Sequence, residues 1–254
     1  MEIFGVHISN QSKKEIQRKL KEFFHNKGNL LVTPNPEMLV AARKSKIFRT
    51  VLNSAVLSIP DGIGLKLMTL GKLHRYTGVE LLENLLDLAQ KEQKSVYLVG
   101  RNDQKWKEKV TKALKEYYPT LRLAGVAVGP RLGFAEGEQG RSLVYDDISE
   151  NNELLADIIQ SAPDLLVVGF GHEKQELWLY EHLLALPSIS IGIGVGGAID
   201  YLAGIVPRAP KWLRSIGLEW LFRLLHNPVR LPRILTATIL FPIYYLYGIT
   251  NNHK

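Results

Sequence analysis

The chain has 254 residues, of which 46% are hydrophobic and 22% are charged, and these ordinary proportions exclude a globally disordered protein. It contains no cysteine, so a disulfide scaffold, a thiolate metal site and a cysteine nucleophile are also excluded. The formal net charge is +7, and residues 205–254 carry +6 of it, with seven basic residues against one acid. The sequence therefore predicts a near-neutral body and a basic tail suited to an anionic partner.

Residues 1–207 are predicted to form an α/β catalytic domain, because short apolar runs alternate there with longer amphipathic stretches. Strands are predicted at residues 3–8, 30–33, 56–59, 95–99, 121–128, 165–168 and 189–195. Helices are predicted at residues 12–25, 78–92, 103–117, 152–161 and 173–186, with Ser12 and either Asn102 or Asp103 as N-caps. This alternation favours a mainly parallel sheet with helices on both faces. The first ten residues lack the basic and apolar segments of a secretion signal.

Residues 129–152 interrupt the alternation of strands and helices. This segment contains Pro130 and four glycines, and its end is rich in acidic residues. A connection of this length inside a domain is either a functional flap or mobile surface. We expect a solvated loop here.

Residues 208–254 are predicted to form a separate appendage. Apolar residues recur at helical spacing in residues 211–226, and residues 234–249 carry no charge. As a helix, the uncharged stretch would extend only about 24 Å against the roughly 30 Å of a bilayer core, and Pro242 is predicted to interrupt it. Basic and aromatic residues beside such a stretch favour a segment that lies in the membrane interface. The alternative is a helix pair packed on the body or on a second subunit.

Several polar motifs directly follow predicted strands, where parallel sheets bind their ligands. They are Thr33-Pro34-Asn35-Pro36-Glu37, Pro60-Asp61-Gly62, His172-Glu173-Lys174-Gln175-Glu176 and the glycine-rich residues 192–200. Asp61 could act as a general base in a partly dry site, although Asp-Gly is most often only a turn. A helix that begins near Lys174 would offer an anion site, and the glycines would allow the backbone to approach a phosphate closely.

Two function classes are suggested by these features taken one by one. Gly192, Gly194 and Gly197 formally match the G-x-G-x-x-G fingerprint, which would indicate an NAD-dependent oxidoreductase. The basic tail alone would suit a non-enzymatic module that binds anionic lipid or nucleic acid, although the near-neutral body argues against a nucleic-acid groove. The chain has neither an H-E-x-x-H motif nor two aspartates separated by one residue, so we expect no bound metal.

The order of the motifs closely resembles that of the WecG/TagA/CpsF family of bacterial glycosyltransferases, over about residues 3 to 233. The matching segments are Thr33–Glu37, Pro60–Gly64, Arg75–Gly78, Gly171 through Lys174-Gln175-Glu176 to Trp178, Gly194–Asp200, Arg208–Pro210 and Gly217–Arg223. The resemblance implies a Rossmann-like α/β fold with a C-terminal appendage that associates with the membrane. It also implies an inverting, metal-independent transfer of N-acetylmannosamine or a related sugar. The donor would be a UDP-sugar and the acceptor a sugar on polyprenyl diphosphate.

The resemblance also implies roles for individual residues. Asp61 would be the general base, and Thr33, Asn35 and Gln175 would line the pocket for the sugar and the acceptor. The expected substrate-binding residues are Arg75, Gly62, Gly171, Lys174, Gly194, Gly196, Gly197, Asp200, Arg208 and Arg214. No cofactor is expected. Backbone amides and the tail arginines Arg208 or Arg214 would neutralise the departing UDP.

The resemblance further places the enzyme in the cytoplasm, peripheral on the inner face of the cell membrane, and leaves a homo-oligomer open. The sequence departs from the family pattern in two places. Residues 129–152 look longer than the usual connection, and Phe170–Glu173 replaces the expected Ala-Pro type of sequence. The second departure leaves the identity of the donor sugar open.

Overall fold

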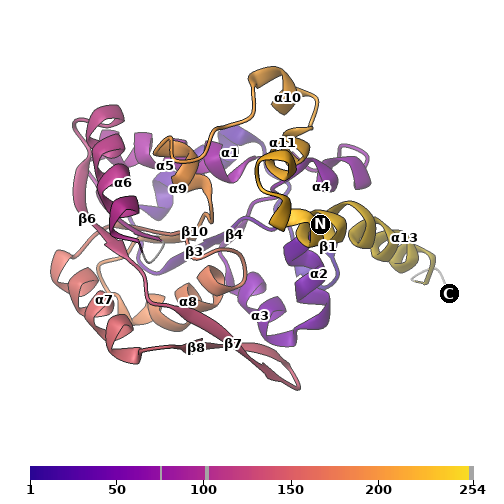
Figure 1. The fold of residues 1–254 in the computed structure, drawn as a ribbon, viewed down its shortest axis with the longest axis horizontal. Coiled ribbons are helices and arrows are strands. Elements are labelled where there is room, and N and C mark those ends of the chain that lie inside the picture. The colour runs from indigo at the N-terminus through magenta and orange to yellow at the C-terminus, as the bar shows by residue number, and fades with distance from the viewer. Residues whose placement is uncertain (75, 101–102, 252–254) are drawn as a thin grey trace.

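The computed structural model describes residues 1–74, 76–100 and 103–251. Six strands form one sheet in the order β4-β3-β10-β9-β5-β6 (Figure 1), and every neighbouring pair is parallel. The strands are β3 (Asn29–Val32), β4 (Leu57–Ser58), β5 (Ser95–Gly100), β6 (Arg122–Val128), β9 (Leu165–Val168) and β10 (Ile191–Gly194). The predicted parallel α/β sheet is confirmed.

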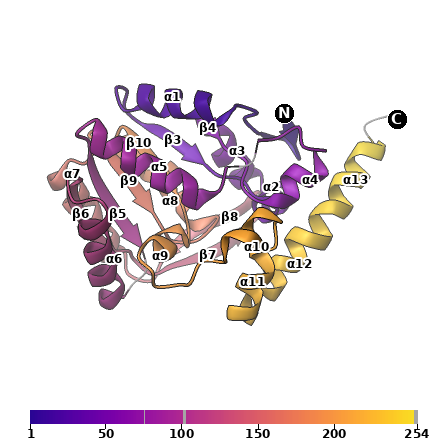
Figure 2. The same ribbon diagram turned by 90° about the horizontal axis from the view of Figure 1, so that it is seen from above.

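Helices cover both faces of this sheet, and each face has its own apolar core (Figure 2). One core lies under α1 (Lys13–Phe23), α5 (Gly78–Lys91), α6 (Gln104–Tyr117) and α9 (Ala198–Leu202). The other lies under α2 (Pro36–Lys44), α3 (Lys46–Ser54), α7 (Ile148–Ser161) and α8 (Lys174–His182), which continues into a 3₁₀ turn at Leu183–Ala185. Strands that are buried on both faces have continuous runs of apolar residues, so the apolar runs in the sequence predicted these strands.

Side-chain caps fix where several helices begin. Ser12 and Thr77 each form a capping box with a glutamate three residues on, and Asp103 caps α6 by accepting from the Lys105 N–H at 3.0 Å. The predicted caps Ser12 and Asp103 are confirmed, whereas Asn102 lies outside the described residues.

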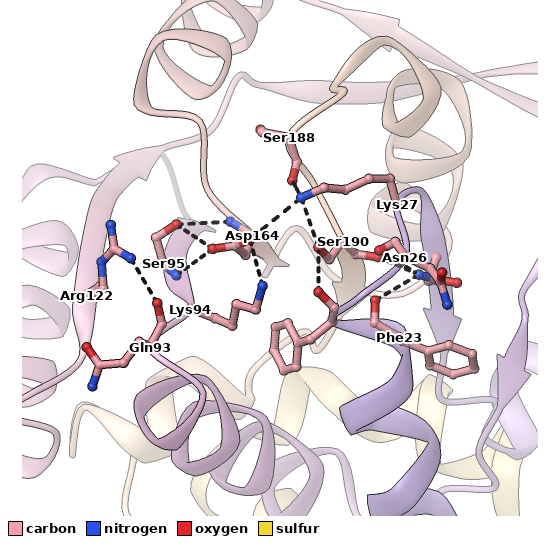
Figure 3. A network of polar contacts seen from close by, with 12 residues as sticks. Phe23, Asn26, Lys27, Gln93, Lys94, Ser95, Arg122, Asp164, Ser188 and Ser190 are labelled. Atoms are coloured by element: carbon pink, nitrogen blue, oxygen red, sulfur yellow. Dashed lines mark hydrogen bonds and ion pairs between the residues drawn. The ribbon is translucent and has the colours of Figure 1, made fainter.

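A network of polar contacts ties the amino ends of the central strands together (Figure 3). Asp164, just before β9, accepts from the N–H and the hydroxyl of Ser95 at 3.0 Å each. Lys27 and Lys94 lie 3.6 Å from the same carboxylate, and Lys27 also donates to the Ser190 hydroxyl at 3.1 Å. Burial acts to raise the pKa of Asp164, but these bonds and charges outweigh it and lower the pKa. Open parallel sheets bind their ligands at the opposite edge, beyond the carboxyl ends of the strands.

The first predicted strand, residues 3–8, is wrong as a single strand. The segment forms a small antiparallel hairpin of β1 (Glu2–Ile3) and β2 (Val6–His7), separate from the main sheet. The chain reverses at Phe4 and Gly5, where φ is +53° and +77°. Ile3 and Val6 therefore both point into the core from different strands.

The loop predicted at residues 129–152 is also wrong. The segment contains the antiparallel hairpin of β7 (Leu132–Gly137) and β8 (Gly140–Tyr145), and α7 begins at Ile148 rather than at residue 152. Phe134 and Leu143 pack against the core formed with α2, α3 and α8. The glycines suggested a loop, but a Cβ at Gly140 would lie 2.0 Å from the Ser45 hydroxyl, so this glycine serves close packing.

The helices of the tail differ from the prediction in two places. The expected helix at 211–226 is divided into α10 (Lys211–Ser215) and α11 (Glu219–His226), with Gly217 at φ +81° between them. After a 3₁₀ turn at Pro228–Arg230, α12 (Leu231–Leu235), a π-helical turn (Thr236–Leu240) and α13 (Phe241–Asn251) follow without a gap. The interruption predicted at Pro242 is wrong, because the π turn just before it changes the hydrogen-bond register of the helix.

One side of this tail helix packs on the body and the other does not. Phe241 is fully buried with its ring 5.7 Å from that of Phe4, and the Arg43 guanidinium lies 4.0 Å from the Tyr244 ring. On the other side, exposed fractions range from 44% to 57% for Leu235, Ile239, Ile243 and Leu246. Within the described ranges, no helix combines the length and the apolar character needed to cross a membrane. Membrane contact and the division into two domains at residue 207 stay predictions.

Candidate active site

A cleft lies at the carboxyl edge of the sheet, where the turns after β3, β4, β9 and β10 meet helices of the tail. It has two adjoining compartments, a larger one of about 540 Å³ and a smaller one of about 230 Å³. Both compartments are lined by Asn35, Asp61, Gly78, Val195, Gly197, Tyr201, Arg223, Arg230 and Arg233. The fold thus brings motifs from opposite ends of the chain together at the carboxyl ends of the strands, where we expected the ligand site.

Asp61 lies where the two compartments meet. Its N–H donates to the Pro34 carbonyl at 2.9 Å, and the next residue, Gly62, has φ +95°, which turns the chain into α4 (Ile63–Met68). The carboxylate lies beside the start of α5, since a Cβ on Gly78 would lie 3.7 Å from Asp61 Oδ2. The positive end of that helix favours a negative charge at this position.

Thr33 and Asn35 line the larger compartment from the turn after β3. Thr33 is buried directly beyond the strand. Asn35 caps α2, with its Oδ1 accepting from the Met38 N–H at 3.0 Å. The cap occupies the side-chain oxygen, so Nδ2 is the atom that Asn35 can offer to a ligand.

Gln175 is held between the glycine-rich turn and α8. Its Oε1 accepts from the Gly196 N–H at 2.9 Å and its Nε2 donates to Glu176 Oε1 at 2.7 Å. A Cβ on Gly194 would lie 2.5 Å from Gln175 Cγ, so this position requires glycine for packing. Gln175 therefore lines the larger compartment and fixes the position of the Gly196 turn.

The G-x-G-x-x-G match has a packing explanation. Gly192 and Gly194 lie inside β10 rather than in the turn after it, and a Cβ on Gly192 would lie 3.0 Å from Leu183. The helix that follows, α9, has only five residues. A dinucleotide fingerprint places its glycines in the turn that opens a long helix, so the oxidoreductase interpretation loses its structural basis.

Glu176 is fully buried beneath the cleft. Its Oε2 accepts from the Glu173 N–H at 2.7 Å, while Oε1 accepts from Gln175. Burial raises the pKa of Glu176 to about 7, against the lowering effect of these hydrogen bonds. Glu176 therefore anchors Gln175 from behind and does not itself line the cleft.

The tail supplies the cations of the cleft. Arg223 on α11 forms an ion pair with Glu219 and lies 4.9 Å from the Tyr201 ring. Burial acts to lower its pKa, but Glu219, Tyr201 and Asp61 raise it overall, so the guanidinium stays charged near the aspartate. Burial, together with the charges of Arg223 and Arg233, lowers the pKa of Arg230.

A cluster of three charged or polar side chains joins the tail to the body at the rim. Arg233 binds Glu37 through two hydrogen bonds, Nε–Oε1 at 2.6 Å and Nη2–Oε2 at 2.9 Å. His172 Nε2 lies 3.5 Å from Glu37 Oε1, and His172 Nδ1 lies 3.3 Å from Arg233 Nη2. Burial lowers the pKa of His172, which is presented by a turn with positive φ at both Gly171 and Glu173.

Three of the predicted cations do not reach the cleft as expected. Arg208 pairs with Glu83 at 3.1 Å, and Arg214 is absent from the described lining of both compartments. Lys174 donates to the Leu132 carbonyl and lies 5.4 Å from the Phe134 ring, so it holds the β7–β8 hairpin. Arg75 lies outside the described residues.

Of the remaining predicted residues, Gly62 lines the smaller compartment and Gly171 and Gly196 line the larger one. Asp200 also lines the larger compartment, where its Oδ1 accepts from the Trp106 indole N–H at 2.9 Å and so anchors α6. The sequence interpretation missed Arg223, Arg230 and Arg233. The spacing of Glu219 and Arg223, one helical turn apart within a recognised motif, was the signal available for the first of them.

Among the residues that the structure describes, no group of three or more histidine or acidic side chains is placed to hold a metal ion. Independence from metal stays a prediction.

The sequence of the chain matches those of known proteins. The sequence profile of the glycosyl transferase WecG/TagA/CpsF family matches residues 1–253. The N-acetylglucosaminyldiphosphoundecaprenol N-acetyl-beta-D-mannosaminyltransferase of Bacillus subtilis strain 168 is 33% identical over 213 residues, which are 82% of this chain and 76% of that protein. The protein of the same name from Staphylococcus aureus strain MW2 is 28% identical over 246 residues, 94% of this chain and 89% of its own. The chain therefore belongs to the glycosyl transferase WecG/TagA/CpsF family.

Proposed function

We propose that the protein transfers N-acetylmannosamine, or a closely related hexose, from a UDP-sugar to N-acetylglucosamine carried on polyprenyl diphosphate. The relatives from Bacillus subtilis and Staphylococcus aureus bear names for this acceptor and this sugar. The observation that carries the proposal is the position of Asp61. Asp61 lines both compartments of the cleft, and its charge is close enough to Arg223 to help raise the pKa of that guanidinium.

The chemistry is a single displacement at the anomeric carbon. The acceptor hydroxyl oxygen attacks C1 of the donor sugar, the bond from C1 to the β-phosphate oxygen breaks, and UDP leaves with that electron pair. Asp61 takes the proton of the attacking hydroxyl as a general base. One displacement inverts the configuration at C1.

The charge that develops on UDP needs positive partners. Arg223 and Arg230 line both compartments. We assign to them the neutralisation of this charge, the role that Arg208 or Arg214 was expected to fill. Guanidinium groups bind phosphate through two hydrogen bonds, so they replace a divalent metal as charge stabilisers in this proposal. Gln175 acts as a positioning residue that holds the Gly196 turn against the donor.

The enzyme is further proposed to work at the inner face of the cell membrane, held there by its tail. The exposed residues Leu235, Ile239, Ile243 and Leu246 form an apolar face on α12 to α13. Such a face beside basic residues is suited to the interface of an anionic bilayer.

The test is UDP release from a panel of UDP-sugars, with and without a short-chain prenyl-diphosphate-N-acetylglucosamine acceptor, in buffer that contains EDTA. We expect acceptor-dependent release from UDP-N-acetylmannosamine or one related donor, unchanged by EDTA. A sample that binds UDP yet releases none with this acceptor would contradict the proposed acceptor. Inhibition by EDTA would contradict the metal-free mechanism.

A further inference from the structure

A strained turn lies directly before α8. Glu173 has φ +70° and ψ −51°. These angles are close to those of the rare, strained form of the γ-turn, at φ about +75° and ψ about −65°. The Glu173 side chain is only 5% exposed, so the turn also buries a carboxylate, and this burial raises the pKa of the group. Both the strain and the burial cost free energy, so other contacts must hold the turn in place.

The β7–β8 hairpin supplies such contacts. Arg141 Nη1 lies 3.6 Å from Glu173 Oε2. The next residue, Lys174, donates to the Leu132 carbonyl of the same hairpin. The charge of Arg141 also acts against the rise in the pKa of Glu173 that burial causes. Arg141 therefore offsets part of the cost of burying this carboxylate.

Arg141 reaches the turn from an anchored element. Glu136 lies directly opposite Arg141 in the register of β7 and β8, and its Oε1 accepts from Arg141 Nε at 2.8 Å. The hairpin lies against α3 and α8 (Figure 1), and the Ile47 N–H of α3 donates to the Gln139 carbonyl at the tip of the hairpin at 3.1 Å. The position of the Arg141 guanidinium is therefore fixed by the body of the protein.

The strained turn connects Arg141 with the rim of the cleft. His172 directly precedes Glu173 and lines the larger compartment. Its Nε2 lies 3.5 Å from Glu37 Oε1, and its Nδ1 lies 3.3 Å from Arg233 Nη2. A further cavity of about 570 Å³ is lined by all five residues, that is, by Arg141, Glu173, His172, Glu37 and Arg233. A cavity offers few packing contacts, so the polar contacts largely fix the turn on this side.

We infer that Arg141 is a positioning residue for the cleft and acts through the strained turn at Glu173. By holding this turn, it places His172 against the ion pair of Glu37 and Arg233. Arg141 itself is absent from the described lining of both compartments. The inference rests on the proposed function and adds to it a residue of the hairpin. Without Arg141, the turn can relax to a less strained conformation, and His172 and Arg233 lose their fixed places in the cleft.

The first test replaces Arg141 and measures the steady-state kinetics of UDP release. We expect Arg141→Ala to raise the KM for at least one substrate about tenfold, the effect of losing one charged contact. The kcat should change less than about twofold, because Asp61 is held separately by its hydrogen bond to Pro34. Arg131→Ala, at an exposed arginine just before β7, is the matched control and should change neither constant. A lower kcat with an unchanged KM would overturn the inference, because that pattern indicates only a loss of folded enzyme.

The second test asks whether Arg141 acts through the turn. Glycine adopts a positive φ without strain and carries no carboxylate, so a Glu173→Gly chain has no need of Arg141 at this position. In that background we expect Arg141→Ala to change the KM less than about twofold. Arg141→Lys, which keeps the charge, should hold the KM within about threefold of the unmodified value. The same rise in KM in both backgrounds would contradict the inference, because Arg141 would then act by another route.

Hydrogen exchange gives a readout that does not depend on catalysis. In Arg141→Ala, the amides of residues 172–175 and 233–236 should exchange about tenfold faster. Those of α1, which packs on the other face of the sheet, should keep their rates. Unchanged exchange in both segments would refute the inference whether or not transfer is detected. Faster exchange together with no transfer by the unmodified enzyme would support the positioning role and refute the proposed function.

Discussion

The body and the tail contribute to the cleft in different ways. In the body, Thr33, Asn35 and Asp61 are positioned by the ends of strands, so their place follows from the sheet and from local hydrogen bonds such as that of Asp61 N–H to Pro34. In the tail, Arg223 and Arg230 reach the cleft only because short helices dock against that edge. The positions of the cleft residues in the body can therefore be predicted from the local sequence. The positions of those in the tail depend on packing between distant segments.

The largest effect is expected at the anchor of the tail. Phe241→Ala should lower the free energy of unfolding by about 3–5 kcal/mol, because it removes a fully buried aromatic side chain that packs against Phe4. The control Ile239→Ala, on the exposed side of the same helix, should change it by less than about 0.5 kcal/mol. Denaturant unfolding measures both. Equal losses in the two variants would mean that the tail is not anchored through Phe241.

The second largest effect is expected from replacing Asp61, the residue of the body proposed as the general base. Asp61→Asn should keep the affinity for UDP but lower turnover by about 10²-fold or more, because an amide cannot accept the proton of the acceptor hydroxyl. Isothermal titration with UDP and a UDP-release assay separate the two quantities. Turnover equal to that of the unmodified enzyme would rule out Asp61 as the base.

Glu176 is expected to make the stability of the protein depend on pH. Its pKa in the folded state is raised to about 7 by burial, above its ordinary value of 4.5, so the folded state holds the proton more tightly than the unfolded state. The contribution of this group to stability is therefore full below pH 4.5 and is lost as the pH rises towards 7, by about 3 kcal/mol in total. Glu176→Gln removes this dependence.

The measurement is the difference in unfolding free energy between Glu176→Gln and the unmodified protein at several pH values from 4.5 to 8. The variant should gain relative stability as the pH rises, because it has no buried charge to form. A difference that stays constant with pH would show that Glu176 keeps an ordinary pKa in the folded protein.

The smallest of the four effects compares two arginines of the tail. Arg223→Ala should weaken UDP binding or lower turnover about tenfold, the effect of losing one charged hydrogen bond in a half-buried site. Arg208→Ala, whose side chain pairs with Glu83 away from the lining, should change both by less than about twofold. If Arg208→Ala has the larger effect, the tail docks differently during the reaction.

Much of the body could be predicted because its signals are local. Fully buried strands such as β9 and β10 are continuous apolar runs, and helices such as α1 begin at recognisable caps. The errors have local causes as well. Glycines needed for close packing, such as Gly140, made a hairpin resemble a loop, and a π turn let a helix continue through Pro242.

The sequence by itself determined the α/β class, the parallel sheet, the family and the motif that places Asp61 after β4. The tertiary structure alone decided which cations enter the cleft. Lys174 donates a hydrogen bond to the β7–β8 hairpin and Arg208 pairs with Glu83. Arg223 and Arg230 instead line both compartments. The physical reason is that a strand end fixes the position of the next few residues, whereas the direction of a long cationic side chain depends on which partners the packed helices bring near it.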